Sequence, residues 1–259
     1  ELYRANANKM VTNTITNAAT STLVFVHGYL GGSLQWQAQV AAFSEHFNVI
    51  TPDLPGFGLS NTLESPETIG GYAAYVLDEL DKQGIDCFCL LGHSMGGMIV
   101  QEMIASAPER VKKLVLYGTG PSGVMPGRFE TISESKQRLI SDGLENSARR
   151  ISAKWFVDGA DSRVYPGCAD IAISASYQAA VAGLSAMSCW SGKAVLSKIT
   201  APTLILWGDQ DQSYLWAQPE ALWKTIPGAS LSVVPGCSHA VHLEKPALFN
   251  AILRDFLMT

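Results

Sequence analysis

The sequence predicts an α/β protein with a mostly parallel central sheet, helices flanking that sheet and an inserted helical cap. Short apolar runs rich in β-branched and aromatic residues alternate with longer segments that have apolar residues at helical spacing. The alternation stops over residues 119–199, where the pattern is mostly helical, and then resumes. We therefore expect residues 1–118 and 200–259 to form one core domain, and residues 119–199 to form a cap or lid over it.

The first part of the core contains four clear strand patterns. Residues 1–22 are polar and rich in Asn and Thr, and they admit one or two edge strands. The patterns that follow predict strands at 22–26, 48–51, 87–91 and 111–117, and helices at 36–46, 66–84 and 95–107.

The cap pattern contains three expected helices, and the core then continues. Turn residues at 158–161 and at 166–167 interrupt the cap. The expected cap helices are 132–142, 144–157 and 168–188; the later core has strands at 203–207 and 230–234 and helices at 218–225 and 246–257.

Composition excludes several classes of protein. The net charge of −5 and the pI near 5.5 argue against a nucleic-acid partner. No apolar run is long enough for a transmembrane helix, so we expect no membrane partner. The chain starts without the layout of a signal peptide, which predicts a cytoplasmic protein, although the missing initiator Met leaves a trimmed leader open. Oligomeric state is not encoded in any pattern we find.

The five cysteines show no metal-ligand spacing and no disulfide framework. Cys87 and Cys89 fall in a predicted core strand, and the other three are dispersed. We therefore expect free thiols in a reducing compartment, no metal site and no cofactor.

Residues 92–97, Gly-His-Ser-Met-Gly-Gly, join a predicted buried strand to a predicted helix. Ser94 stands at the junction, with Gly92 and Gly96 two residues to either side. This is the pattern of a nucleophile elbow, in which a sharp turn lifts the serine hydroxyl clear of the sheet. The motif alone is weak; its place between a strand and a helix strengthens it. The alternative is a tight turn whose serine only caps the helix.

A serine nucleophile needs a base, and the base needs an acid. His239 follows the last strand, and the carboxyl ends of parallel strands are where sites form. His242 is its rival, three residues later. Asp209 and Asp211 both follow the strand at 203–207, and the later position suits the acid better. The expected catalytic residues are Ser94, Asp211 and His239, in the order typical of this constellation.

Negative charge on a tetrahedral intermediate needs two donors. The backbone N–H of Met95 faces it from the helix N-terminus, and the glycine-rich loop after the first strand supplies a second N–H, that of Tyr29. An ordinary glycine turn is the alternative for that loop.

With these motifs in order, the chain resembles the α/β-hydrolase superfamily, in particular its serine-nucleophile esterase and lactonase-like members. The residues that carry the resemblance are His27-Gly28, 53–60, 92–97, 208–211 and 239–246. The resemblance implies the fold and the triad but not the substrate. It implies a structural role for Asp53. Ser238 departs from the glycine that often precedes the family's histidine, and the oxyanion loop lacks the proline common in ring-fission C–C hydrolases.

Large apolar residues of the cap, with others from the core loops, predict an apolar pocket. The candidates for its lining are Leu30, Phe129, Trp155, Tyr177, Trp190, Trp216 and His242. Arg149 and Arg150 admit an acidic substrate, although a solvated helix face explains them more simply.

The function expected is a serine hydrolase that cleaves a small to medium carboxylic ester or lactone through an acyl-enzyme on Ser94. One alternative is a C–C bond hydrolase of a ring-fission-type diketone with the same triad. Others are a ligand receptor without turnover and a cofactor-free perhydrolase on the same scaffold.

Overall fold

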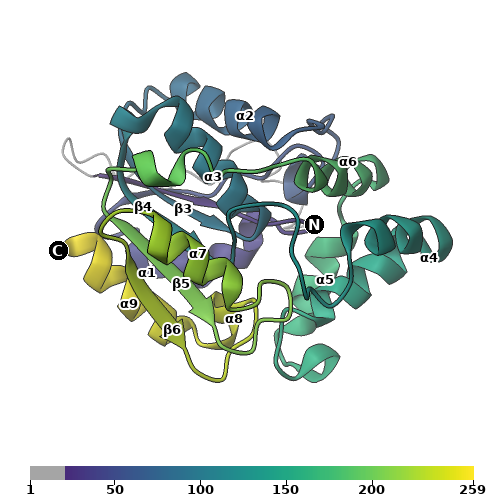
Figure 1. Ribbon diagram of the computed structural model, residues 1–259. Coiled ribbons are helices and arrows are strands. Elements are labelled where there is room, and N and C mark those ends of the chain that lie inside the picture. The colour runs from purple at the N-terminus through teal and green to yellow at the C-terminus, as the bar shows by residue number, and fades with distance from the viewer. Residues whose placement is uncertain (1–20) are drawn as a thin grey trace.

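A computed structural model describes residues 21–259 of the chain, in which six strands form one parallel sheet (Figure 1). The strand order is β2-β1-β3-β4-β5-β6. The strands are β1 (Thr22–Val26), β2 (Asn48–Ile50), β3 (Phe88–His93), β4 (Val111–Tyr117), β5 (Thr203–Gly208) and β6 (Ser230–Val234). The predicted edge strands before β1 lie outside the described residues.

Every strand pairing in this part of the chain is parallel. β1, β3 and β5 are buried along their whole length, as their unbroken apolar runs require. The edge strand β6 is mostly accessible, and only Val234 in it is buried. Because the strands are parallel, the loops that follow β3, β5 and β6 meet at one edge of the sheet.

Helices cover both faces of the sheet (Figure 1). On one face, Leu23 and Phe25 of β1 pack with residues of α1 and α9. On the other face, Val24 and Val26 belong to the apolar core that α2 and α3 share. The helices are α1 (Gln37–Phe43), α2 (Ile69–Lys82), α3 (Met95–Ser106), α4 (Ile132–Ala153), α5 (Tyr165–Ile173), α6 (Tyr177–Ser188), α7 (Ala217–Thr225), α8 (Val241–Glu244) and α9 (Pro246–Met258).

The segment between β4 and β5 contains α4, α5 and α6, which lie to one side of the sheet in Figure 1. Gly143 has a φ of 78° and interrupts α4 where the sequence predicts a boundary between two helices. The prediction of one helix over 168–188 is wrong, because two helices occupy this range. Ser176 starts the second, and its side chain accepts a hydrogen bond from the N–H of Ala179.

The two ends of this inserted segment lie side by side. Ser122 and Ser191 form an isolated antiparallel bridge. The N–H of Gly123 donates to the carbonyl of Trp190, and the N–H of Gly192 donates to that of Pro121. The division into core and cap domains stays a prediction, but the insertion is closed at its base by these contacts.

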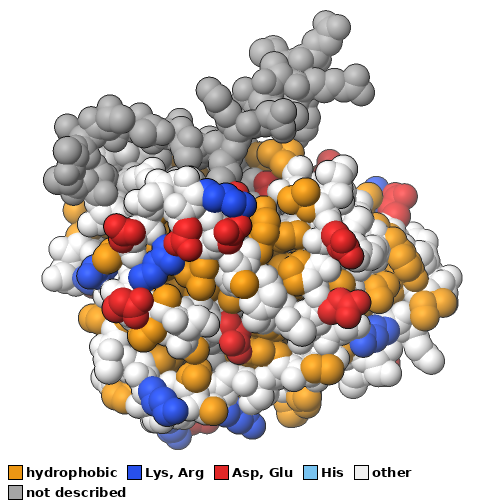
Figure 2. Space-filling model, turned by 90° about the horizontal axis from the view of Figure 1, so that it is seen from above, with side chains coloured by type: hydrophobic (Ala, Val, Ile, Leu, Met, Phe, Trp, Pro, Cys, Tyr) orange, Lys and Arg blue, Asp and Glu red, His pale blue; other side chains and the backbone are white. Residues whose placement is uncertain are grey.

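The surface carries dispersed charge. On the face shown in Figure 2, Lys and Arg side chains are scattered among Asp and Glu side chains rather than gathered into one basic patch.

Among the helices of residues 21–259, none has the length and apolar character needed to cross a membrane. All five cysteines are free thiols.

Candidate active site

Ser94 occupies a strained turn between β3 and α3. Its φ of 58° and ψ of −122° lie outside the regions that L-residues commonly adopt. A Cβ at Gly92 would lie 2.3 Å from the carbonyl oxygen of Gly96, and a Cβ at Gly96 would lie 2.3 Å from that of Val26. Glycine is therefore required on both sides of the turn. Thr119 donates its hydroxyl proton to the carbonyl of Ser94 at 2.7 Å and holds the turn from the end of β4.

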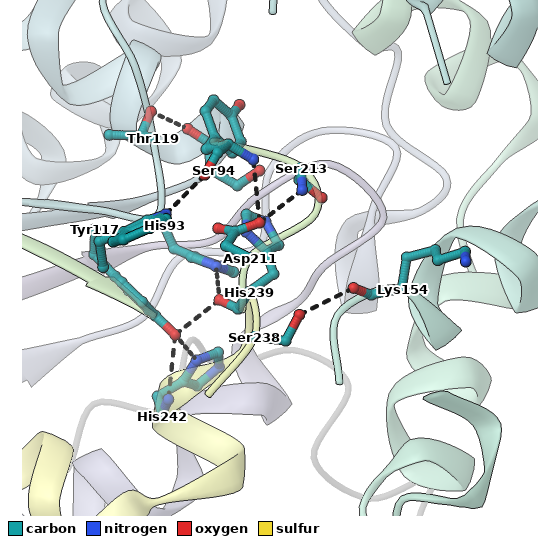
Figure 3. A network of polar contacts seen from close by, with 12 residues as sticks. His93, Ser94, Tyr117, Thr119, Lys154, Asp211, Ser213, Ser238, His239 and His242 are labelled. Atoms are coloured by element: carbon teal, nitrogen blue, oxygen red, sulfur yellow. Dashed lines mark hydrogen bonds and ion pairs between the residues drawn. The ribbon is translucent and has the colours of Figure 1, made fainter. Parts of the chain in front are cut away.

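Asp211 and His239 form a buried pair at the carboxyl edge of the sheet (Figure 3). Nδ1 of His239 lies 2.8 Å from Oδ2 of Asp211, and the two residues are 2% and 4% exposed. The backbone N–H groups of Ser213 and Tyr214 donate to the other oxygen of this carboxylate, at 2.7 and 3.1 Å. These bonds hold the carboxylate in position as a hydrogen-bond acceptor. Asp209 instead accepts from the N–H of Gly236 in a turn.

Ser94 and His239 line the same cavity, so the structure brings all three expected catalytic residues together. Within the described residues, the hydrogen bonds of the site include the Asp211–His239 link but no bond between the hydroxyl of Ser94 and the ring of His239. The hydroxyl of Tyr214 lies near the side chains of both Ser94 and Thr119. The ring of Tyr214 also stacks on that of His239, with centroids 5.6 Å apart and an interplanar angle of 11°.

The backbone of His239 is anchored from below by a cluster of rings. His93 Nε2–H and the Tyr117 hydroxyl both donate to the carbonyl oxygen of His239, at 2.9 and 3.0 Å (Figure 3). Because the Tyr117 proton goes to that carbonyl, His242 donates its Nδ1–H to the Tyr117 oxygen at 3.0 Å. His242 therefore supports the loop that contains His239 from within the core, where its ring stacks on that of Trp36.

Burial keeps these supporting groups neutral. Desolvation lowers the pKa of His93 well below its ordinary value, with the neighbouring His239 as a smaller cause. Desolvation also lowers the pKa of His242 to about 3. It raises the pKa of Tyr117 well above its usual range. Neutral His93 and Tyr117 keep the protons with which they bind the carbonyl of His239.

The loop after β1 lies directly beside Ser94. A Cβ at Gly28 would lie 2.8 Å from that of Ser94, so glycine is needed for this close approach. His27 has a structural place: its Nδ1 bonds the Gly28 carbonyl and its Nε2 accepts from the N–H of Leu54. Leu30 adopts a φ of 58°, a second strained position that the sequence does not reveal. Among the described residues, no hydrogen-bond acceptor meets the backbone N–H of Tyr29 or of Met95.

The cavity over Ser94 is small, about 20 Å³. That is room for about one water molecule, so a substrate must displace side chains when it enters. The lining consists of Tyr29, Ser94, Met125, Arg128, Ile151, Trp155, Met187, Ser213, Tyr214 and His239.

Of the expected pocket residues, Trp155 lines this cavity and the others lie elsewhere. Tyr177 and Trp216 are 48% and 38% exposed. Trp190 donates its indole N–H to Glu102. Leu30, Phe129 and His242 are absent from the lining, and His242 belongs to the ring cluster under the base.

Sequence reasoning missed Tyr214 and Arg128 as cavity residues. Tyr214 follows Asp211 by three residues and donates its N–H to the Asp211 carboxylate, so its position in that turn is a signal that the sequence contains. Arg128 lies in an irregular segment with no periodicity, and nothing in the sequence separates it from a surface arginine.

Ser238 and Glu244 connect the loop that contains His239 to the segment inserted between β4 and β5. The Ser238 hydroxyl donates to the carbonyl of Lys154 at 3.3 Å, at the end of α4. The Glu244 carboxylate accepts from the N–H groups of Val157 and Ser238, each at 2.7 Å. Ser238, which departs from the expected glycine, is thus fully buried and used in this contact. Residues 21–259 contain no cluster of side chains suited to a metal ion.

A sequence model described as the alpha/beta hydrolase fold matches residues 21–246. One curated relative is the dihydrolipoyllysine-residue acetyltransferase component of an acetoin cleaving system from Cupriavidus necator, 28% identical over 242 residues. The alignment covers 91% of this chain and 63% of that protein, so the chain spans less than two thirds of its length. A 2-hydroxy-6-oxononadienedioate/2-hydroxy-6-oxononatrienedioate hydrolase from Paraburkholderia phymatum is 30% identical, with 93% of this chain and 88% of the relative covered.

The fold is also similar to solved structures. A bromoperoxidase from Bacillus anthracis superposes with a TM-score of 0.86 and 26% identity, and the match covers 93% of each chain.

Proposed function

The chain belongs to the alpha/beta hydrolase fold family, and on that premise we propose that it is a serine hydrolase that cleaves a small to medium carboxylic ester or lactone. The observation that carries the proposal is the buried Asp211–His239 pair, which opens into the cavity that Ser94 lines. A ligand receptor has no need of a proton relay, so this arrangement favours turnover.

The first step is attack by Ser94 on the substrate carbonyl. Asp211 accepts the Nδ1–H of His239, which leaves Nε2 of that ring as the proton acceptor. Rotation about the Cα–Cβ bond of Ser94 brings its hydroxyl to this nitrogen. As the new C–O bond forms, the proton passes to Nε2, and Asp211 stabilises the imidazolium.

The backbone N–H groups of Tyr29 and Met95 receive the developing oxyanion in this proposal. Both donors lie beside Ser94 and meet no acceptor among the described residues. The N-terminus of α3 adds its partial positive charge at Met95. Each such donor stabilises a transition state by about 3–4 kcal/mol.

Collapse of the intermediate breaks the bond to the leaving alcohol, which takes the proton from His239. Water then attacks the acyl-enzyme, with His239 as the base, and releases the acid and free Ser94. No cofactor or metal takes part in this sequence.

Fluorophosphonate labelling tests the proposal directly. Folded wild-type protein should be labelled at Ser94, and Ser94→Ala should not be labelled. The labelled site is read by peptide mass spectrometry, and hydrolysis of 4-nitrophenyl esters measures turnover. Failure to label Ser94 in folded protein would sink the proposal.

A C–C bond hydrolase is the second candidate, favoured by the 30% identical relative that is named for a dienedioate substrate. The same triad serves both reactions. Vinylogous diketones assayed beside simple esters separate them: a kcat/KM at least tenfold higher for the diketone would select this alternative.

A further inference from the structure

Arg128 stands in the wall between two hollows of the molecule. It lines the small cavity that contains Ser94 and His239. It also lines an outer hollow of about 300 Å³, formed mainly by residues 123–127 and the start of α4. Met125 is the other residue common to both linings. A molecule that passes from the outer hollow to Ser94 therefore meets Met125 and Arg128.

The guanidinium of Arg128 has no carboxylate partner in residues 21–259. Its Nη1 donates to the carbonyl oxygen of Glu130 and to the hydroxyl of Ser135, both at 3.3 Å. These acceptors are neutral, and the bonds are long. The nearby carboxylate of Glu130 is held instead by Arg150 and by Arg138. The guanidinium also lies over the ring of Phe129, 4.7 Å from its centroid. Arg128 thus keeps further N–H donors, and no carboxylate of residues 21–259 forms an ion pair with it.

Partial burial makes the positive charge of the Arg128 guanidinium energetically unfavourable. Desolvation lowers the pKa of Arg128, and the neighbouring Tyr214 and Glu130 oppose that effect. The guanidinium nevertheless remains charged at neutral pH, since arginine does not deprotonate in proteins. A charged group in such a position is stabilised by an anion that binds it through two parallel hydrogen bonds.

The rest of the cavity lining does not oppose an anion. Met125, Ile151, Trp155 and Met187 are apolar, and the remaining lining residues are Ser, Tyr and His. Neither Asp211, which is bonded to His239, nor Glu130, which is paired with Arg150, belongs to the lining. The two methionines and Arg128 have long flexible chains, which suits a cavity that must widen for substrate.

We propose that Arg128 binds an anionic group of the substrate, so that the preferred substrate is a carboxylate-bearing ester or lactone, such as a half-ester of a dicarboxylic acid. The inference rests on the proposed function, because it takes Ser94 as the nucleophile. It adds a specificity residue and a substrate class. The bidentate geometry of arginine and carboxylate makes lysine a poor replacement at this position.

Two esters with equal numbers of acyl carbons test the proposal: 4-nitrophenyl hydrogen glutarate and 4-nitrophenyl pentanoate. They differ in a terminal carboxylate against a methyl group. Wild-type protein should show the higher kcat/KM for the glutarate ester. Arg128→Gln should lower that value about 10- to 100-fold and change the value for pentanoate less than about threefold, as expected for loss of one charged hydrogen-bonded contact. Arg128→Lys should have a kcat/KM for the glutarate ester between those of wild type and Arg128→Gln.

Arg149→Gln is the matched control, because Arg149 lies on α4 in an exposed pair with Glu145. It should leave the ratio of the two kcat/KM values unchanged. Free glutarate gives a second readout without turnover: it should raise the Tm of wild-type protein and of Arg149→Gln, but not of Arg128→Gln.

The outcomes separate the two proposals. If Ser94 is labelled by fluorophosphonate and both esters are cleaved, but Arg128→Gln leaves their ratio unchanged, the assignment of Arg128 is overturned. If neither ester is cleaved and Ser94 is not labelled, the proposed function fails. In that case the thermal shift with glutarate still decides whether Arg128 binds an anion. Labelling of Arg128→Gln at the wild-type rate shows that this variant folds.

Discussion

Nδ1 of His239 lies 2.8 Å from Oδ2 of Asp211, and both side chains are almost completely removed from solvent. We expect Asp211→Asn to lower kcat for ester hydrolysis by about 10³- to 10⁴-fold, because an amide can donate to Nδ1 and so select the wrong tautomer. Steady-state kinetics measures the loss. Asp209→Asn is the control, since Asp209 binds only a turn N–H, and its kcat should stay within about threefold. An Asp211→Asn variant with more than a tenth of wild-type kcat contradicts the relay.

Stability should fall as the pH drops below 6.5, partly because of His242. Burial lowers its pKa in the folded state to about 3, whereas the unfolded chain has the ordinary value near 6.5. Between these values the unfolded state binds the extra proton, so this group's contribution is present above pH 6.5 and is lost as the pH falls toward 3. Each such group contributes a slope of about 1.4 kcal/mol per pH unit. His93 acts in the same direction.

Urea titrations at pH 7, 5.5 and 4.5 check this. His242→Gln should be less stable than wild type at pH 7, and its free energy of unfolding should fall less steeply with acid. Parallel curves for the two proteins would show that His242 is not the titrating group.

The turn around Ser94 requires glycine at position 96. Gly96→Ala would place a methyl group 2.3 Å from the carbonyl oxygen of Val26, within the central sheet. We expect a loss of at least about 2–3 kcal/mol in the free energy of unfolding, as for other overpacked cores, together with loss of fluorophosphonate labelling. Gly70→Ala in α2 is the matched control, because a Cβ there meets nothing within 4 Å. Its stability should be unchanged or raised by up to about 1 kcal/mol. Equal stabilities for the two variants would refute the steric argument.

Glu244 should couple the loop that contains His239 to the segment inserted between β4 and β5. Glu244→Ala removes the acceptor of the Val157 and Ser238 N–H groups, and we expect it to lower the free energy of unfolding by about 1–3 kcal/mol. It should also lower kcat, since Ser238 adjoins the base. Thermal denaturation and ester kinetics measure the two effects. Glu220→Ala removes an exposed ion pair with Lys224 and is the control. It should leave the free energy of unfolding and kcat nearly unchanged. A Glu244→Ala variant as stable and active as Glu220→Ala would show that this contact is dispensable.

The sheet was predictable because its strands are apolar runs that end at turn residues. The predicted strands at 22–26, 111–117 and 230–234 coincide with β1, β4 and β6. The cap was harder. Its third predicted helix spans apolar residues at 168–188, yet Ser176 caps a second helix there and the chain turns between the two.

The catalytic candidates came from position at the ends of strands, whereas the pocket could not be derived in this way. Tyr177 and Trp216 are aromatic and lie near the expected region of sequence, but the direction in which each side chain points depends on packing across the fold. His242 shows the same limit: spacing made it a rival base, and burial made it a support for the carbonyl of His239. The place of Arg128 beside Ser94 in the cavity depends on how distant segments pack together, and no local sequence pattern indicates that packing.

The bridge between Ser122 and Ser191 has an evolutionary consequence. Since the chain leaves the sheet and returns to it at neighbouring points, everything between these points can lengthen, shorten or be replaced without shifting the register of β4 against β5. We expect a chimera that carries a foreign insertion between these two serines to keep the register of the sheet, and to acquire the donor's selectivity where the insertion also restores the contacts with Ser238 and Glu244. The protein would then be a convenient recipient for such transplants.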